Sequence, residues 1–249
     1  MLSAPLVWAL LVAAPPGPAM TLERADLLAA TARAERVVAR KARAVATALA
    51  AYDALIAARP KDRKLVPRLR RRRAGLLVHA KRLRAALTEH DRTLLGPARR
   101  KDRARALHDG AVLLARLKEP DEAEARYARV LDEYPDIVRM RAQASLARGR
   151  IRQAQGDPKG AERCFRHVVE KCRDETKAVI GAYDALALLE IERGRCDHAR
   201  RWLERCTRRY AKQATRDDRT GRFVARLLGE MKAPAALAAP DSKGGAAGG

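Results

Sequence analysis

The chain has 249 residues, of which 47 % are hydrophobic and only 4 % aromatic, and its formal net charge is +23. This length excludes more than two domains but leaves ample material for a buried core. The positive charge favours polyanionic partners, namely nucleic acid, anionic lipid or acidic protein.

An all-α fold is predicted by the residue types and their order. Ala, Leu, Arg and Glu, which dominate the chain, are strong helix formers. Long stretches contain no Gly or Pro, and no stretch alternates with the period of two expected of a β-strand.

Residues 1–19 have the composition of a secretory signal peptide. An apolar run over residues 5–14 precedes two prolines and the triplet Gly17-Pro18-Ala19. The run is too short to span a bilayer, and cleavage after it would start the mature chain at Met20. Export would place the protein in the periplasm or outside the cell. Because no Lys or Arg precedes the run, two alternatives stay open: Met20 is the true start, which implies a cytoplasmic protein, or the segment is a disordered N-terminus.

Residues 20–97 carry two series of apolar residues in steps of three and four, from Leu28 to Ile56 and from Val66 to Leu94. Joined by "RPKDRKLVP", the two series predict one long, coiled-coil-like antiparallel hairpin, which offers a surface for homo-oligomerisation. An alternative is that "AAYDALIAARP", around Tyr52, is the second helix of a degenerate repeat.

A dense basic run, "RLRRRR", lies within the second series. Its cations form a candidate polyanion patch for nucleic acid or an anionic envelope polymer, and they are Arg68, Arg70, Arg71, Arg72 and Arg73. The alternative is that arginine merely fills solvated positions, since it is spread along the whole chain. Aromatic stacking platforms outside the expected core are few, Tyr183 and Phe223, so any nucleic-acid binding is expected to be nonspecific.

Residues 98–231 contain an internal repeat with a period of 38. Three copies align in columns of like residues: Ala106, Ala144 and Ala182; Ala111, Gly149 and Ala187; Ala123, Ala161 and Ala199; Tyr127, Phe165 and Leu203; Val130, Val168 and Cys206. The first helices are expected at about Arg103–Leu117, Arg141–Gln155 and Thr176–Arg193. Between helices, Gly156 suits a left-handed helix end, Asp157 an N-cap and Pro158 a first helical residue. Because one hairpin cannot cover its own apolar face, the copies are expected to stack as an α-solenoid.

These residues resemble the tetratricopeptide repeat family, in the pattern of a small residue in the first helix, Gly at the turn, and Ala and an aromatic in the second helix. The longer period and "VLDEYPD" are similar to the repeats of bacterial envelope proteins of the Tol-Pal coordination and outer-membrane assembly type. The resemblance implies a protein-interaction scaffold that binds an acidic or amphipathic peptide in a groove formed by the first helices. The groove-facing positions would be Arg105, His108, Val112, Gln143, Leu146, Arg150, Gln153, Asp184, Leu188 and Ile191. The alternative is that three repeats only scaffold the chain.

Catalytic signatures are not found in the sequence. The five histidines do not form a helical metalloprotease motif, the glycines outside the C-terminal tail mark turns rather than a phosphate loop, and serines are scarce after residue 19. We therefore expect no enzyme, no cofactor and no metal. In an exported chain the even number of cysteines favours disulfides, and the pairing Cys164–Cys196 and Cys172–Cys206 is topologically feasible, since the second helices of adjacent repeats are expected to lie side by side.

Two alternatives for the cysteines stay open: buried free thiols, or a zinc site formed by Cys164 and Cys196 with His167 and His198, whose spacing fits no recognised finger. Residues 232–249 are an Ala, Gly and Pro tail that is expected to be disordered. Two functions remain in competition: an exported, non-enzymatic interaction scaffold, and a basic polyanion-binding protein.

Overall fold

The computed structural model describes residues 21–35 and 38–214, and these residues form ten α-helices and no β-strand. The prediction of an all-α fold is confirmed. The predicted signal peptide (1–19), the predicted tail (232–249) and Phe223 lie outside the described residues. Within the described ranges, no helix combines the length and the apolar character needed to cross a bilayer. The chain divides into two compact units, residues 1–151 and 152–249.

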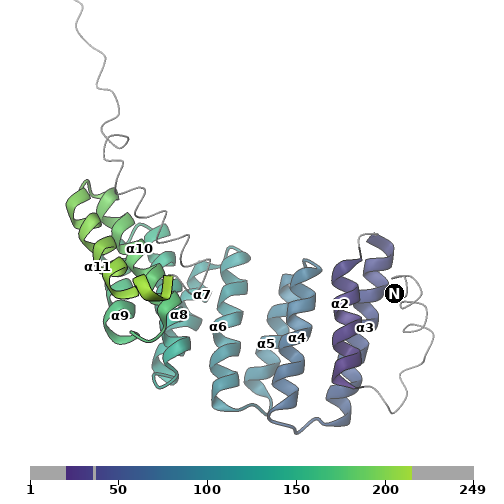
Figure 1. Ribbon diagram of the computed structural model, residues 1–249. Coiled ribbons are helices and arrows are strands. Elements are labelled where there is room, and N and C mark those ends of the chain that lie inside the picture. Colours follow the sequence, from purple (N-terminus) through teal and green to yellow (C-terminus); the bar gives the residue numbers. More distant parts are fainter. Residues whose placement is uncertain (1–20, 36–37, 215–249) are drawn as a thin grey trace, which may run out of the picture. The chain divides into compact units, whose positions relative to one another are not determined.

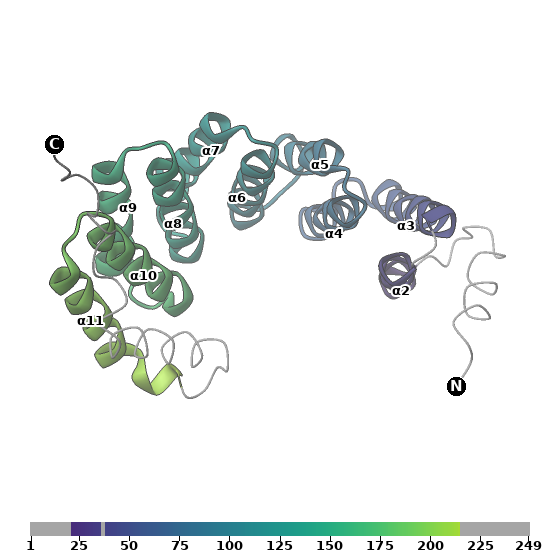
Figure 2. The ribbon, with the colours of Figure 1, turned by 90° about the horizontal axis from the view of Figure 1, so that it is seen from above.

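The first unit is a stack of helical hairpins. The hairpins are α2 (Leu22–Ala34) with α3 (Val38–Ala58), α4 (Leu65–His79) with α5 (Leu83–Leu95), and α6 (Arg100–Arg116) with α7 (Pro120–Glu133), followed by most of α8 (Val138–Ala154). Figures 1 and 2 show the first helices α2, α4 and α6 in one layer and the second helices α3, α5 and α7 in another. One apolar core runs from Ala74 in α4 to Ala144 in α8. Residues on both sides of the predicted domain boundary at residue 97 therefore share one core. The boundary itself stays a prediction.

The predicted long hairpin over residues 20–97 was wrong in its length, because each of its two series is divided between two helices. The first series breaks between Ala34 and Val38, and the second breaks between His79 and Leu83. The second break is a tight turn around Lys81, whose φ is 61°. Lysine gives no sequence signal for such a turn, because a left-handed backbone usually calls for glycine.

The second unit contains α9 (Pro158–Lys171), α10 (Thr176–Glu192) and α11 (Cys196–Ala214), and α10 packs against both of the others. The predicted start of α9 is confirmed. The Asp157 carboxylate accepts a hydrogen bond of 2.8 Å from the amide of Gly160, and Pro158 is the first helical residue.

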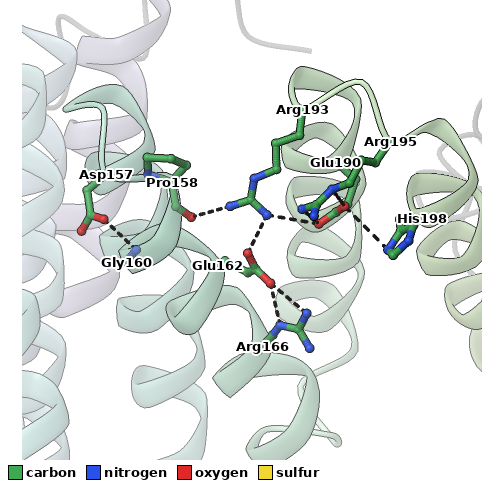
Figure 3. Close-up of polar contacts among 9 residues, drawn as sticks. All are labelled: Asp157, Pro158, Gly160, Glu162, Arg166, Glu190, Arg193, Arg195 and His198. Atoms are coloured by element: carbon green, nitrogen blue, oxygen red, sulfur yellow. Dashed lines mark hydrogen bonds and ion pairs between the residues drawn. The ribbon is translucent and has the colours of Figure 1, made fainter.

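A network of ion pairs joins α9 to the α10–α11 hairpin (Figure 3). The Arg193 guanidinium donates to Glu162 on α9 at 2.7 Å and to the buried Glu190 on α10 at 3.2 Å. Arg166 also donates to Glu162, and Arg195 lies 2.7 Å from Glu190. Burial acts to raise the pKa of Glu162, but the hydrogen bonds from Arg193 and Arg166 outweigh it and lower that pKa. Some of the many arginines therefore form ion pairs that connect the helices of this unit.

Four of the turns between helices are alike, each with one left-handed residue: Lys81 (φ 61°), Lys118 (67°), Gly156 (79°) and Gly194 (72°). In every case the next amide donates to the carbonyl oxygen five residues earlier, which is a Schellman closure. The bonds run from Arg82 to Leu77 (2.8 Å), Glu119 to Leu114 (3.0 Å), Asp157 to Arg152 (2.8 Å) and Arg195 to Glu190 (2.8 Å). Since the turns follow one another at 37 or 38 residues, the repeat extends one copy upstream of the three predicted.

The second helices of these four copies bury the same three positions. The first position is Ala86, Ala123, Ala161 and Ala199; the second is His90, Tyr127, Phe165 and Leu203; the third is Thr93, Val130, Val168 and Cys206. Among these four helices, only α5 places polar side chains, His90 and Thr93, at the second and third positions. The repeat is therefore least apolar where α5 packs under α4 and α6.

Candidate functional site

A pocket opens in the first unit between the first helices α4 and α6, with α5 beneath it. Its volume is about 120 Å³, which is well above what a single water molecule needs. The lining residues are Lys64, Pro67, Arg68, Arg71, His90, Thr93, Arg99, Asp102, Arg105, Ala106 and Asp109. We call the site that these residues form the basic pocket.

The two polar residues of α5 line the deep side of the basic pocket. His90 is only 6 % exposed and Thr93 only 3 %. The Thr93 hydroxyl donates to the Glu89 carbonyl oxygen at 3.0 Å, so its proton is already used. Burial lowers the pKa of His90, which favours the neutral imidazole at pH 7. The buried polar group that is left to meet a ligand is therefore His90.

The groups that act on His90 come from four helices. Asp109 on α6 and Asp91 on α5 favour its protonation, whereas Arg126 on α7 and Arg71 on α4 oppose it. Burial is the largest of these influences. Because the two carboxylates and the two arginines act in opposite directions, an added anion would raise the pKa of His90.

Cations dominate the wall of the basic pocket. Arg99 is paired with Asp102 at 2.8 Å. The other four cations form no ion pair with any described residue; they are Lys64, Arg68, Arg71 and Arg105. Because Asp102 is paired with Arg99, one carboxylate of the pocket is left for these four cations.

That carboxylate belongs to Asp109. His108 Nδ1 lies 3.1 Å from its oxygen. Burial acts to raise the pKa of Asp109, but the contact with His108 and the charges of His90 and Arg105 outweigh it, so the pKa falls below its ordinary value. Asp109 is therefore ionised at neutral pH and offsets one of the four positive charges.

The predicted arginine run is divided by the structure. Arg68 and Arg71 line the basic pocket. Arg70 donates to the carbonyl oxygen of Arg92, and the other two cations are paired within the unit, Arg72 with Asp26 and Arg73 with Asp53. The run is therefore not one continuous patch of unpaired charge.

The predicted groove residues fall in both units. In the first unit, Arg105 lines the basic pocket, His108 contacts Asp109, and Val112 is 38 % exposed. On α8, Gln143 and Leu146 are half-buried and Arg150 is exposed.

In the second unit, Gln153 donates to Glu192 at 2.9 Å, and Leu188 and Ile191 are exposed. Asp184 is half-buried. A groove that includes the predicted residues of both units stays a prediction.

No disulfide joins the four cysteines, all of which lie in the described residues. Cys172 and Cys206 are buried in the core, Cys164 is half-buried and Cys196 is exposed. The two feasible pairs, Cys164–Cys196 and Cys172–Cys206, are thus not formed in this structure. In the described part of the chain, no three His, Cys, Asp or Glu side chains come together as metal ligands.

Eight lining residues of the basic pocket were not predicted as site residues from the sequence: Lys64, Pro67, His90, Thr93, Arg99, Asp102, Ala106 and Asp109. Among them are the two polar residues of α5, His90 and Thr93. The signal for these two was present, because a step of 37 residues upstream from Tyr127 and Val130 leads to His90 and Thr93. A second basic hollow, beside Tyr134, is less suited to a ligand because its Arg100 is already paired with Asp136 at 2.8 Å.

Known structures share this fold. Two crystal structures of MamA are each 15 % identical to this chain and cover 71 % of it, with TM-scores of 0.52 and 0.51, and 94 % and 88 % of their own chains are matched. A tetratricopeptide repeat protein from Parabacteroides merdae is 16 % identical over 88 % of this chain and 81 % of its own, with a TM-score of 0.49. No sequence model of a protein family matches the chain, and no curated protein does. At these identities the likeness concerns the fold, an α-solenoid of tetratricopeptide-like hairpins.

Proposed function

We propose that the chain is a non-enzymatic interaction module that binds an acidic, amphipathic segment of a partner protein along the first-helix layer of its first unit. The observation that carries this proposal is the basic pocket, with four cations that form no ion pair with a described residue. Stacked repeats generally bind partners on the surface that their parallel helices create.

The spacing of the residues defines the segment that would fit. Arg105 and Val112 lie seven residues apart on α6, which is about 10 Å along the helix axis. In an extended peptide, about three residues cover that distance. We therefore expect the partner to carry an acidic residue for the basic pocket and an apolar residue about three positions away, for Val112 and Leu146.

A peptide library selected on the full chain would test this proposal. The pocket variant is Arg68→Gln, Arg71→Gln and Arg105→Gln combined. The control variant removes the same charge from three exposed arginines that lie outside the pocket and have no ion pair with a described residue: Arg43, Arg116 and Arg139. We expect selected peptides to share the acidic and apolar spacing, and to lose at least about tenfold in affinity with the pocket variant only. Equal losses with both variants would contradict the proposal.

Export to the cell envelope is part of the same proposal and is supported by the composition of residues 1–19. N-terminal sequencing of material from fractionated cells should find Met20 first, outside the cytoplasm. An intact Met1 in the cytosol would exclude export.

A second candidate is the binding of polyanions through dispersed arginines, favoured by the net charge of +23. The two candidates differ in their dependence on particular residues. Binding to DNA through dispersed charge should weaken steeply with salt, show no sequence preference, and respond equally to the pocket and control variants.

A further inference from the structure

We infer that the basic pocket is a site for a phosphoryl group, an oxyanion with two negative charges, rather than for a single carboxylate. A phosphoryl group on the acidic segment of a partner would bring this anion to the pocket, and to that extent the inference rests on the proposed function. The same chemistry is present in free inorganic phosphate, so the pocket can be tested without a partner.

The charge balance of the basic pocket favours a dianion. Lys64, Arg68, Arg71 and Arg105 have no ion pair with a described residue, and among the lining residues only Asp109 is left to offset one of them. A bound carboxylate would leave a surplus of two positive charges, whereas a phosphoryl dianion would leave one. Guanidinium groups form paired hydrogen bonds with phosphate and carboxylate oxygens alike, so the charge of the anion is what distinguishes the two ligands here.

The form of the pocket also favours a compact oxyanion over a contact with an open surface. The pocket lies between two first helices and reaches the buried His90 on α5, which takes the place that Tyr127, Phe165 and Leu203 fill in the other copies. The residues that line the pocket come from α4, α5 and α6, so a phosphoryl group bound there would be surrounded by all three helices. In the other copies, the large apolar residue would close this position.

The like charges and the buried imidazole of the basic pocket are unfavourable for the stability of the fold. Like charges held near one another repel, and a buried imidazole loses hydration that an apolar residue would not need. Both costs fall when an anion binds, since it attracts the cations and accepts a hydrogen bond from His90. The repeat could avoid these costs with the apolar residues that it uses elsewhere, so their presence here indicates a ligand.

Calorimetry on the full chain at constant ionic strength would test the inference, with inorganic phosphate and acetate as the two probes. We expect phosphate to bind at least about tenfold more tightly than acetate. Arg68→Gln and Arg71→Gln should each weaken phosphate binding by about tenfold. The matched control is Arg116→Gln, an exposed arginine of α6 outside the pocket, which should change it by less than about twofold.

Three peptides that differ at one position, Ser, Glu or phosphoserine, would separate this inference from the proposed function. The expected order of affinity is phosphoserine, then Glu, then Ser, with the gain for phosphoserine lost in Arg68→Gln. If Glu and phosphoserine bind equally and phosphate binds no better than acetate, the phosphoryl site is excluded while the acidic-segment proposal stands. If phosphate binds but none of the peptides does, the site stands and the proposed partner does not. Equal losses with Arg68→Gln and Arg116→Gln would overturn the inference.

Discussion

His90 occupies a position that the repeat reserves for a large apolar side chain, and this single difference creates the polar floor of the basic pocket. Its imidazole is 6 % exposed and surrounded by the charges of four helices. A residue that binds a ligand in this way is expected to cost stability, because buried polar groups lose hydration. Stability and binding should therefore respond to its substitution in opposite directions.

His90→Phe places in α5 the residue that α9 has as Phe165. We expect the free energy of unfolding to rise by about 1 kcal/mol, because a buried polar ring is replaced by an apolar one, while phosphate binding weakens. Urea denaturation and calorimetry would measure the two effects. His79→Phe, at an exposed position of α4 outside the pocket, should leave both unchanged. A variant that is both less stable and equally able to bind phosphate would contradict this role of His90.

Binding of a dianion should also change the protonation of His90. Burial lowers its pKa, so the imidazole is neutral at pH 7 in the free protein. A dianion beside it, together with Asp109 and Asp91, raises that pKa against Arg71 and Arg126, so the protein takes up protons on binding. Sulfate, which does not titrate near pH 7, is a suitable probe. Its binding enthalpy should differ between buffers of different ionisation enthalpy in the wild type and not in His90→Phe; a wild type without buffer dependence would contradict the expectation.

At the scale of secondary structure elements, the turns determine where each helix ends. Gly156 and Gly194 adopt the left-handed backbone at little cost, but Lys81 and Lys118 have φ values of 61° and 67° with a side chain attached. A residue with a Cβ in this region is strained by about 1 kcal/mol. The two lysine turns are therefore held by the helices that pack on either side.

Lys118→Gly should stabilise the first unit by up to about 0.5 kcal/mol, because the relief of that strain exceeds the cost of the greater freedom of glycine in the unfolded chain. Lys118→Ala is the control, since it removes the charge and leaves the Cβ. Urea denaturation should show a gain for Gly and none for Ala. Equal stability of the two variants would mean that the backbone at Lys118 is not strained.

The same turns explain what the sequence could and could not predict. The α8–α9 turn carries Gly156, Asp157 and Pro158, each suited to its place, and its position was predicted correctly. The turn at Lys81 carries none of these signals, so its two helices were taken for one. That error also concealed the pocket, because His90 was assigned to a coiled-coil series instead of to the repeat position of Tyr127.

The ion pairs between α9 and α10 predict how the stability of the second unit depends on pH. Hydrogen bonds from Arg193 and Arg166 lower the pKa of Glu162 below its ordinary value of 4.5. A carboxylate with a lower pKa in the folded state stabilises it above the ordinary pKa, and this contribution is lost as the pH falls through the folded value.

Glu162→Gln should therefore cost about 1 kcal/mol at pH 7, and the difference from the wild type should shrink below pH ~4.5. Urea midpoints measured from pH 7 to pH 3 would check it. The matched control is Glu204→Gln, an exposed carboxylate of α11 with no ion pair among the described residues. It should show neither the loss nor the pH dependence. A difference that stays constant to pH 3 would contradict the assignment.

At the scale of the whole molecule, the excess of 53 Lys and Arg over 30 Asp and Glu has two separate consequences. Some arginines are used inside the fold, as Arg72, Arg73 and Arg193 show. The remaining charge repels itself, so any salt should stabilise the folded chain by screening. A specific anion site should add a further stabilisation that only the anion it binds can produce.

Thermal unfolding in chloride and in phosphate at equal ionic strength would separate these two effects. We expect both salts to raise Tm through screening, and phosphate to raise it further because it binds the folded state alone; at 100 times its Kd the gain is about 2.7 kcal/mol. The pocket variant of Arg68, Arg71 and Arg105 should keep the chloride response and lose the extra response to phosphate. The control variant of Arg43, Arg116 and Arg139, with the same net charge, should keep both. If the two variants behave alike, the excess charge acts only as a diffuse field, and the basic pocket has no part in the response to anions.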